Sequence, residues 1–205
     1  LVITTLKQFG IPQQLDSTLR LRWPNVNLQW LELTETPPGQ LATAHISIKN
    51  LLESNTSKTK RDQSLLIHNC DTGFNWNETC LPLSSDASMP VFEASGMHWS
   101  FGRPDPINSN RAIAIAEKQR ISSLASIGLY GFRSMVGFMN HAEWHLKKAG
   151  QVRGEHYIAP LLQYLIEQGQ IVSLPRVENV RLYGTPDELC KTFSITLEQL
   201  ISENQ

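Results

Sequence analysis

The feature of this sequence that most constrains its fold is an alternation of strand-like and helix-like segments at its start. Short apolar or alternating runs, typical of strands, are separated by segments whose apolar residues recur with the helical period. The expected strands are 1–6, 26–33 and 64–70, and the expected helices are 12–23 and 39–53. This β-α-β-α order favours an α/β domain with a mixed, mainly parallel sheet, because parallel strands need a crossover connection, usually a helix.

The remainder of the sequence is less regular, but it ends in well-marked helices. Three segments predict strands, the first of them one strand followed by a loop: 92–110, 111–117 and 125–132. Helices are expected at 138–150, 157–169, 185–193 and 196–203, and 171–184 predicts two strands or one broken strand. The helix at 185–193 begins with a capping box, Thr185 and Glu188, and with Pro at its first position. Without an internal repeat or a linker, 1–205 is expected to form one domain.

Composition narrows the range of functions. The net charge is -1 with no run of like charge, which argues against a general nucleic-acid-binding surface. No apolar stretch approaches the ~20 residues that span a bilayer, so no membrane contact is expected. The three Cys have no zinc-motif spacing, which favours reduced thiols in a cytoplasmic protein. The chain opens on a strand-like segment without Met, and we expect that its beginning is missing.

Four motifs stand in a characteristic order along the sequence. They are TPPGQLATA at 36–44, NCD at 69–71, EKQRISSLASIGLYGF at 117–132 and RLYGTPDEL at 181–189. Together, and with GEHYIAPLLQYLIEQGQIV at 154–172 between the last two, they resemble the sugar-phosphate nucleotidyltransferases, also called nucleotide-sugar pyrophosphorylases. The resemblance covers nearly the whole chain.

The resemblance implies a three-layer, glycosyltransferase-A-like (Rossmann-like) domain. It implies an enzyme that joins a nucleoside triphosphate to a sugar phosphate or similar small phosphate, releases pyrophosphate, and serves surface polysaccharide synthesis. In this reaction the acceptor's phosphate oxygen attacks the α-phosphorus in line, which mainly needs positioning and charge neutralisation. Mg²⁺ is the implied cofactor, since it prefers few carboxylates together with phosphate oxygens. An oligomer is compatible with these expectations.

The resemblance also assigns roles to individual residues. Asp71, at the end of the strand 64–70, would bind Mg²⁺; taken without the neighbouring motifs, it is better explained as a turn residue. Lys118 would be a catalytic charge on the acceptor phosphate and Glu117 would bind a polar group of the acceptor; otherwise they are an exposed pair at a strand end. The expected substrate-binding residues are Gly39 and Gln40 at the base, and Glu117, Gly128, Tyr130, Glu155 and Tyr157 at the acceptor. Arg103, in a predicted loop, could meet a phosphate.

The sequence departs from the family in two places. The 205 residues contain neither the Gly-rich loop followed by Arg nor the Lys-Pro pair that hold the triphosphate in relatives, and we expect this piece ahead of Leu1. Many relatives also carry a second metal-binding Asp where this chain has Leu182. Asp187 is nearby but suits the helix dipole of its own first turn, so one metal held chiefly by Asp71 and phosphates is expected.

Other functions remain open at this level. A degenerate relative could keep the acceptor pocket without catalysis. A glycosyltransferase on the same fold usually needs Asp-x-Asp, which DTG at 71–73 does not supply. His141 and His145 are four residues apart on an expected helix, but the order is not H-E-x-x-H and no third zinc ligand is obvious.

Overall fold

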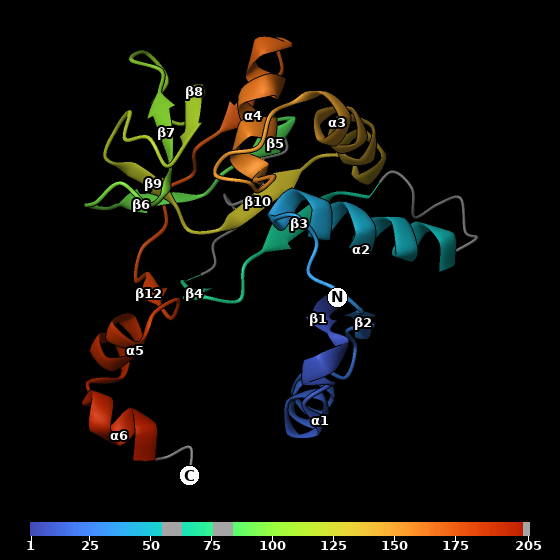
Figure 1. The fold of residues 1–205 in the computed structure, drawn as a ribbon. Coiled ribbons are helices and arrows are strands. Elements are labelled where there is room, and N and C mark those ends of the chain that lie inside the picture. The colour runs from blue at the N-terminus through green and yellow to red at the C-terminus, as the bar shows by residue number, and fades with distance from the viewer. Residues whose placement is uncertain (55–62, 76–83, 203–205) are drawn as a thin grey trace. The chain divides into compact units, whose positions relative to one another are not determined.

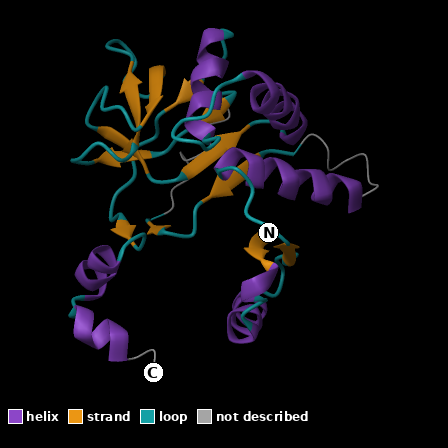
Figure 2. Cartoon of the chain, in the orientation of Figure 1, coloured by secondary structure: helices purple, strands orange, loops and turns teal. Residues whose placement is uncertain are grey.

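The computed structural model describes residues 1–54, 63–75 and 84–202. Helices and strands both occur throughout these residues (Figures 1 and 2), so the expected α/β class is confirmed. The chain divides into two compact units, each built from two segments. Unit 1 is Leu1–Arg61 with Met139–Tyr157, and unit 2 is Asp62–Phe138 with Ile158–Gln205.

Unit 1 begins with the predicted strand-helix-strand-helix order. Its elements are β1 (Val2–Leu6), the short 3-10 helix Lys7–Phe9, α1 (Gln13–Arg22), β2 (Gln29–Leu33) and α2 (Gln40–Ser54). Strands β1 and β2 pair in parallel, with Val2 opposite Gln29, as their connection through α1 predicts. On α2, Leu41, Ala44 and Ile48 are buried, which is the apolar stripe expected from their helical spacing.

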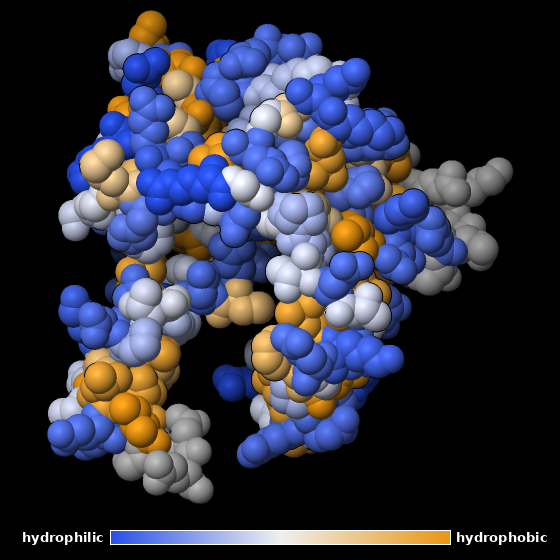
Figure 3. Space-filling view, in the orientation of Figure 1, coloured by the Kyte–Doolittle hydropathy of each residue, from blue (hydrophilic) through white to orange (hydrophobic). Residues whose placement is uncertain are grey.

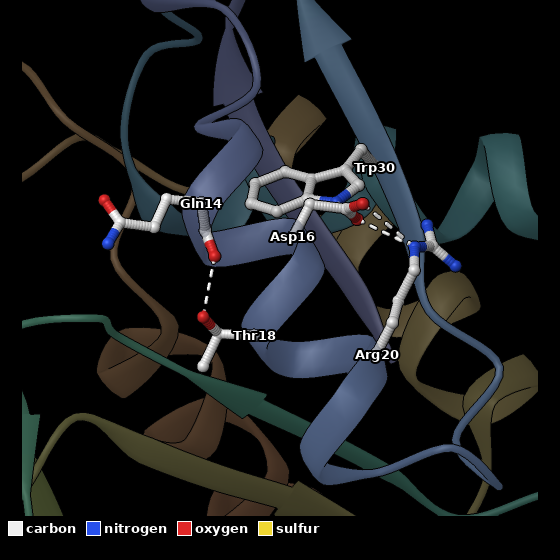
Figure 4. Close-up of polar contacts among 5 residues, drawn as sticks. All are labelled: Gln14, Asp16, Thr18, Arg20 and Trp30. Carbon is white, nitrogen blue, oxygen red and sulfur yellow. Dashed lines mark hydrogen bonds and ion pairs between the residues drawn. The ribbon is translucent and has the colours of Figure 1, made fainter.

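Helix α1 is attached to β2 by one carboxylate. The Trp30 indole N–H donates to Asp16 Oδ1 at 2.8 Å, and Arg20 Nε donates to both Asp16 oxygens at 3.0 Å (Figure 4). The bonds from Arg20 and then Trp30 lower the pKa of Asp16 below its ordinary value. In the same helix, the Thr18 hydroxyl donates to the carbonyl oxygen of Gln14, four residues before it, at 2.7 Å (Figure 4). This is a common arrangement for Thr within a helix.

Unit 2 contains three sheets among its described residues. The first has the order β11-β5-β10-β3, the second β12-β4, and the third β6-β9-β7-β8. The strands of the first two are β3 (Leu65–His68), β4 (Thr72–Gly73), β5 (Ala87–Ser88), β10 (Leu129–Phe132), β11 (Val172–Ser173) and β12 (Arg181–Leu182). Those of the third are β6 (Val91–Glu93), β7 (Ser100–Pro104), β8 (Ala112–Glu117) and β9 (Leu124–Ser126).

The helices follow the sequence pattern closely. They are α3 (Met135–Lys148), α4 (Ile158–Glu167), α5 (Pro186–Phe193) and α6 (Leu197–Ser202). Helix α4 packs on β8, and the Gln163 side chain accepts a hydrogen bond from the Ile115 N–H at 2.7 Å. The buried residues of α4 are Ile158, Ala159, Leu161, Leu162 and Leu165.

Two expectations about the strands are wrong. Within the described residues most pairings between strands are antiparallel; β1–β2 and β5–β11 are parallel, as is the isolated bridge between Val91 and Arg176. Short connections such as that between β7 and β8 cannot make a parallel crossover. The segments expected to hold one strand each, 92–110 and 125–132, contribute to two strands each. The second is broken at Gly128, whose φ of +76° turns the chain from one sheet to the other.

Helices α5 and α6 present apolar side chains to solvent. Phe193, Leu197 and Ile201 are each more than half exposed, and Figure 3 shows the hydrophobic surface that gathers over these helices. The Phe193 ring also stacks on Tyr183 at a centroid separation of 5.9 Å. Of the helices that the structure describes, none is long and apolar enough to cross a membrane.

Candidate functional site

Asp71 lies where the chain leaves β3 and enters β4. The Asn69 N–H donates to the Gly128 carbonyl at 2.9 Å and extends the pairing of β3 with β10, whereas Asp71 belongs to the turn that follows. The carbonyl of Asp71 accepts from the Tyr183 N–H at 2.8 Å, and its carboxylate accepts from the Thr72 hydroxyl at 3.3 Å. Asp71 is exposed, so it occupies the predicted strand end and its carboxylate is accessible.

A second carboxylate lies beside Asp71, around Gly184. A Cβ atom built on Gly184 would lie 3.2 Å from Glu188 Oε2 and 3.5 Å from Asp71 Oδ2. Glu188 is in the first turn of α5, where its N–H donates to the N-cap Thr185 hydroxyl at 3.2 Å, as the capping box predicts. Sequence reasoning did not place Glu188 beside Asp71. Leu182 pairs with Thr72 across β12 and β4.

Glu117 and Lys118 come together at the end of β8. Glu117 is opposite Ser100 in the pairing of β8 with β7, and the Ser100 hydroxyl donates to Glu117 Oε2. Lys118 has a φ of +52°, uncommon for a residue with a side chain, and its N–H donates to the Trp99 carbonyl at 2.9 Å. The backbone turn at Lys118 is therefore fixed by a main-chain bond to the neighbouring strand.

Tyr130 lies in the interior beside Glu117. It is 3% exposed. Burial raises the pKa of Tyr130, the neighbouring Ser126 and Ser100 hydroxyls act in the opposite direction, and the charges of Glu117 and Asp71 raise it further. Tyr130 is thus close enough to Glu117 and Asp71 for both charges to influence its pKa, and its role at an acceptor pocket stays a prediction.

Gly128 joins the strand that carries Tyr130 to the turn that carries Asp71. Its N–H donates to the Ser126 hydroxyl at 3.0 Å, and its carbonyl accepts from Asn69. A Cβ on Gly128 would lie 2.9 Å from the Asn69 side-chain nitrogen. Five of the sequence-predicted residues therefore share unit 2: Asp71, Glu117, Lys118, Gly128 and Tyr130.

The remaining predicted residues lie together in unit 1. The His156 N–H donates to the Pro38 carbonyl at 2.9 Å, and the Leu41 N–H donates to the His156 carbonyl at 2.8 Å. These bonds hold the loop before α2 against the segment 155–157. They bring together the predicted base-side and acceptor-side residues of this unit: Gly39, Gln40, Glu155 and Tyr157.

Gly39 is required by the backbone at this contact. Its φ is +102°, and a Cβ there would lie 2.6 Å from His156 N and 3.1 Å from Glu155 Cβ. The close approach that Gly39 permits is therefore to the protein's own main chain. Gln40 begins α2, one residue after the helix start expected from the sequence.

The other sequence candidates have ordinary positions. Arg103, expected in a loop, is an exposed residue of β7. His145 of α3 is buried, and burial, followed by the nearby His156, lowers its pKa. Cys70 is an exposed free thiol and Cys190 a half-buried one, and Cys80 lies outside the described residues. No group of three or more His, Cys, Asp or Glu able to hold a metal occurs in 1–54, 63–75 and 84–202.

Comparisons with known proteins give the fold. No family model and no curated protein matches the sequence. A nucleoside-diphosphate-sugar pyrophosphorylase from Vibrio cholerae matches with a TM-score of 0.79 at 24% identity, over 94% of this chain and 79% of that one. An inositol-1-phosphate CTP transferase from T. maritima matches with a TM-score of 0.59 at 13% identity, over 92% and 70%.

This chain has the sugar nucleotidyltransferase fold. The match extends over almost all of its residues and includes both compact units. It agrees with the glycosyltransferase-A-like, Rossmann-like architecture with a mixed sheet that the four motifs imply.

Proposed function

We propose that this chain is the catalytic-type domain of a sugar-phosphate nucleotidyltransferase. It would transfer a nucleoside monophosphate from a nucleoside triphosphate to a sugar phosphate or a similar small phosphate. The observation that carries the proposal is that Asp71 and Glu117, the residue before Lys118, both lie close enough to Tyr130 to influence its pKa, in a chain with the sugar nucleotidyltransferase fold. This transfer needs a pair of carboxylates, a carboxylate that accepts a hydrogen bond from a hydroxyl of the acceptor, and a positively charged side chain.

The chemistry assigns one task to each group. An anionic oxygen of the acceptor phosphate forms a bond to the α-phosphorus, and the bond from that phosphorus to the bridging oxygen of pyrophosphate breaks. The leaving pyrophosphate takes the electron pair, so no proton has to be moved by the protein. Lys118 binds the acceptor phosphate as a point charge, and Glu117 accepts a hydrogen bond from a hydroxyl of the acceptor.

The donor set around Gly184 fits Mg²⁺. Asp71 and Glu188 supply two carboxylate oxygens near one point, and the missing Cβ of Gly184 leaves that point open. Mg²⁺ is usually bound by one or two carboxylates, with phosphate oxygens and water completing its shell. A bound Mg²⁺ would neutralise charge on the triphosphate, and Asp71 with Glu188 would hold it.

A second candidate is a module that binds sugar phosphate without turnover. It is favoured by the absence, from all 205 residues, of a Gly-rich loop followed by Arg. Both candidates predict the same acceptor site, and pyrophosphate release separates them. We expect residues 1–205 alone to release little or no pyrophosphate from any of the common nucleoside triphosphates with glucose 1-phosphate. Robust release would exclude the module without turnover.

Calorimetric titration tests the acceptor site that both candidates share. Glucose 1-phosphate and glucose are titrated into the parent chain and into the Lys118→Ala variant. Because charge-assisted hydrogen bonds contribute about 1.5–3 kcal/mol, we expect Lys118→Ala to weaken glucose 1-phosphate binding roughly ten- to a hundredfold. Binding of glucose should hardly change.

The exposed Lys148, at the end of α3, offers a matched control. Lys148→Ala removes the same charge elsewhere and should leave both affinities unchanged. Equal losses for both ligands in Lys118→Ala would contradict the phosphate role. Absence of binding to the parent chain would contradict the proposed function itself.

A further inference from the structure

The backbone conformation of Lys118 interrupts the alternation of side chains along β8. Its φ is +52°, whereas an antiparallel strand has a φ of about −140°, so the chain at Lys118 is rotated about the N–Cα bond by roughly half a turn. The Cβ atom moves with this rotation. Consecutive side chains of a regular strand point to opposite faces, so after the rotation the Lys118 side chain leaves the chain on the same side as that of Glu117.

The left-handed conformation of Lys118 needs support from its surroundings, because it is unfavourable for a residue with a side chain. The Lys118 N–H donates to the Trp99 carbonyl at 2.9 Å. The pairing of β7 with β8 ends at Ser100 and Glu117, so this bond lies just beyond the last strand pair. It fixes the turn to the extent that the Trp99 carbonyl is itself held in place.

Arg120 ties the loop that carries Lys118, residues 118–123, to the loop that carries the Trp99 carbonyl, residues 94–99. Arg120 Nη1 donates to the Gly96 carbonyl at 3.3 Å. The Arg120 guanidinium carbon also lies 5.8 Å from the centroid of the Phe101 ring, within the range of a cation–π contact. One side chain therefore contacts the neighbouring loop and the strand β7 that follows it.

The two loops are also joined at their base. The Ala94 N–H donates to the Ser123 carbonyl at 3.1 Å, and the Ser122 hydroxyl donates to the Gly102 carbonyl at 2.7 Å. Both bonds are farther along the chain from the left-handed turn than Arg120 is. Arg120 thus supports the end of the loop that carries the turn, and it is exposed, so its removal should leave the fold intact.

We propose that Arg120 is a positioning residue that holds Lys118 in its left-handed conformation, so that the Lys118 ammonium group and the Glu117 carboxylate face the same phosphorylated acceptor. This inference rests on the proposed function for its ligand, but the support that Arg120 gives to Lys118 can be tested without any ligand. Arg120 acts through Lys118 and does not itself bind the phosphate. Loss of the Arg120 side chain weakens recognition of the phosphate group.

The ligand-free test measures amide hydrogen exchange by NMR in the parent chain and three variants. Arg120→Ala removes both contacts of the guanidinium group. Arg22→Ala is the matched control, because Arg22 is also exposed and its guanidinium carbon lies 5.3 Å from the centroid of the Trp23 ring, in unit 1. Ser122→Ala is the control for a loop that is loosened at its base.

We expect the Lys118 amide to exchange faster in Arg120→Ala than in the parent chain and in both controls. The Ile115 amide of β8, which donates to Gln163 Oε1 at 2.7 Å, should exchange at its parental rate and so report that the strand is intact. Unchanged exchange of the Lys118 amide in Arg120→Ala would overturn the proposal. Equal acceleration in Ser122→Ala would also overturn it, because the loop as a whole would then place Lys118.

The ligand test is a double-mutant cycle in calorimetric titrations with glucose 1-phosphate and inorganic phosphate. Because a displaced Lys118 loses part of a charge-assisted hydrogen bond, Arg120→Ala should weaken binding of both probes roughly three- to tenfold. In the Lys118→Ala background, Arg120→Ala should cause no further loss, since a residue that acts through another has no effect once the other is removed.

Two outcomes of this cycle would overturn the positioning role. Losses that add in the double variant would mean that the charge of Arg120 acts on the phosphate directly. Unchanged affinities in Arg120→Ala would mean that Lys118 keeps its place without Arg120. A parent chain that binds neither probe would refute the proposed function, while the exchange of the Lys118 amide would still decide whether Arg120 holds the turn.

Discussion

The loop contact of unit 1 and the side-chain contact at Glu117 in unit 2 hold predicted site residues by different means. In unit 1 the residues around Gly39 are held by main-chain bonds, two of which involve the backbone of His156. In unit 2 the Glu117 carboxylate is held by the Ser100 hydroxyl. The main-chain contact depends on the absence of a side chain at one Gly, whereas the side-chain contact depends on the identity of both residues.

This difference predicts two kinds of sensitivity. The loop of unit 1 should tolerate changes of exposed side chains and fail when its Gly gains a Cβ. The cluster of unit 2 should keep its backbone when a hydroxyl or carboxylate is removed, and lose binding instead.

The largest effect is expected for Gly39→Ala. The new Ala would have to keep a φ of +102°, and its Cβ would lie 2.6 Å from the backbone nitrogen of His156. We therefore expect a loss of roughly 2–4 kcal/mol in the free energy of unfolding. Urea denaturation measures this loss. Gly10→Ala is the control, since Gly10 also has a positive φ, +64°, but nothing within 4 Å of the added Cβ. Equal losses in the two variants would mean that backbone strain, not the His156 contact, limits this loop.

The next effect concerns the carboxylates of unit 2. Mn²⁺ serves as the probe in place of Mg²⁺, because its binding can be measured by electron paramagnetic resonance. Asp71→Asn should weaken Mn²⁺ binding roughly tenfold or more, and Glu188→Gln roughly three- to tenfold. Each substitution removes one charged oxygen ligand. Gln keeps the capping position of Glu188, so the fold should be preserved. Asp187→Asn in the same helical turn serves as the control. If it weakened Mn²⁺ binding as much as Glu188→Gln, the general charge of α5 would be responsible.

A smaller effect is expected for the stability of Tyr130→Phe. Removing the buried hydroxyl leaves the neighbouring Ser100 and Ser126 hydroxyls with one polar neighbour fewer, at a cost of about 1 kcal/mol. Thermal and urea denaturation would be compared with Ser122→Ala. A loss as large as that of Gly39→Ala would abolish the contrast between the two regions, because a single side-chain hydroxyl of unit 2 would then be essential to folding.

The smallest effect is a pH dependence in unit 1. Burial, followed by the nearby His156, lowers the pKa of His145 below its ordinary value of 6.5, so the unfolded chain takes up the proton first as the pH falls. The contribution of His145 to the free energy of unfolding is complete above the pKa that His145 has in the unfolded chain. This contribution is lost as the pH falls through the lower pKa that His145 has in the folded chain. His145→Gln should flatten this acid slope in urea denaturation measured between about pH 7 and pH 5. His141→Gln on the same helix should retain it, and an unchanged slope in His145→Gln would assign the dependence to other groups.

Sequence reasoning predicted well where one period persists over many residues. The apolar stripe on α2 and the one on α4 correspond to helices that begin within a residue or so of their expected starts. The capping box at Thr185 likewise gave the start of α5. In these segments local propensity and burial favour the same structure.

The failures have physical causes. The break between β9 and β10 depends on the conformation of Gly128, which an apolar run such as ASIGLYGF does not reveal. Sequence reasoning did not place Glu188 beside Asp71, because the first turn of α5 comes near Asp71 only through the pairing of β12 with β4. The strand that carries Tyr130, β10, pairs with β3 and β5, which are far from it in the sequence. No local pattern encodes such pairings.

A substitution at Gly184 could separate the proposed cation binding from the folded state genetically. Gly184 does not have the positive φ of Gly39, and the nearest atom to its added Cβ would be the terminal oxygen of a flexible Glu188 side chain, at 3.2 Å. A single codon change to Ala would therefore place a methyl group between two carboxylates at little cost to the backbone. Such an allele would separate loss of cation binding from loss of the folded protein, so a cell carrying it would show which of the two matters to its physiology.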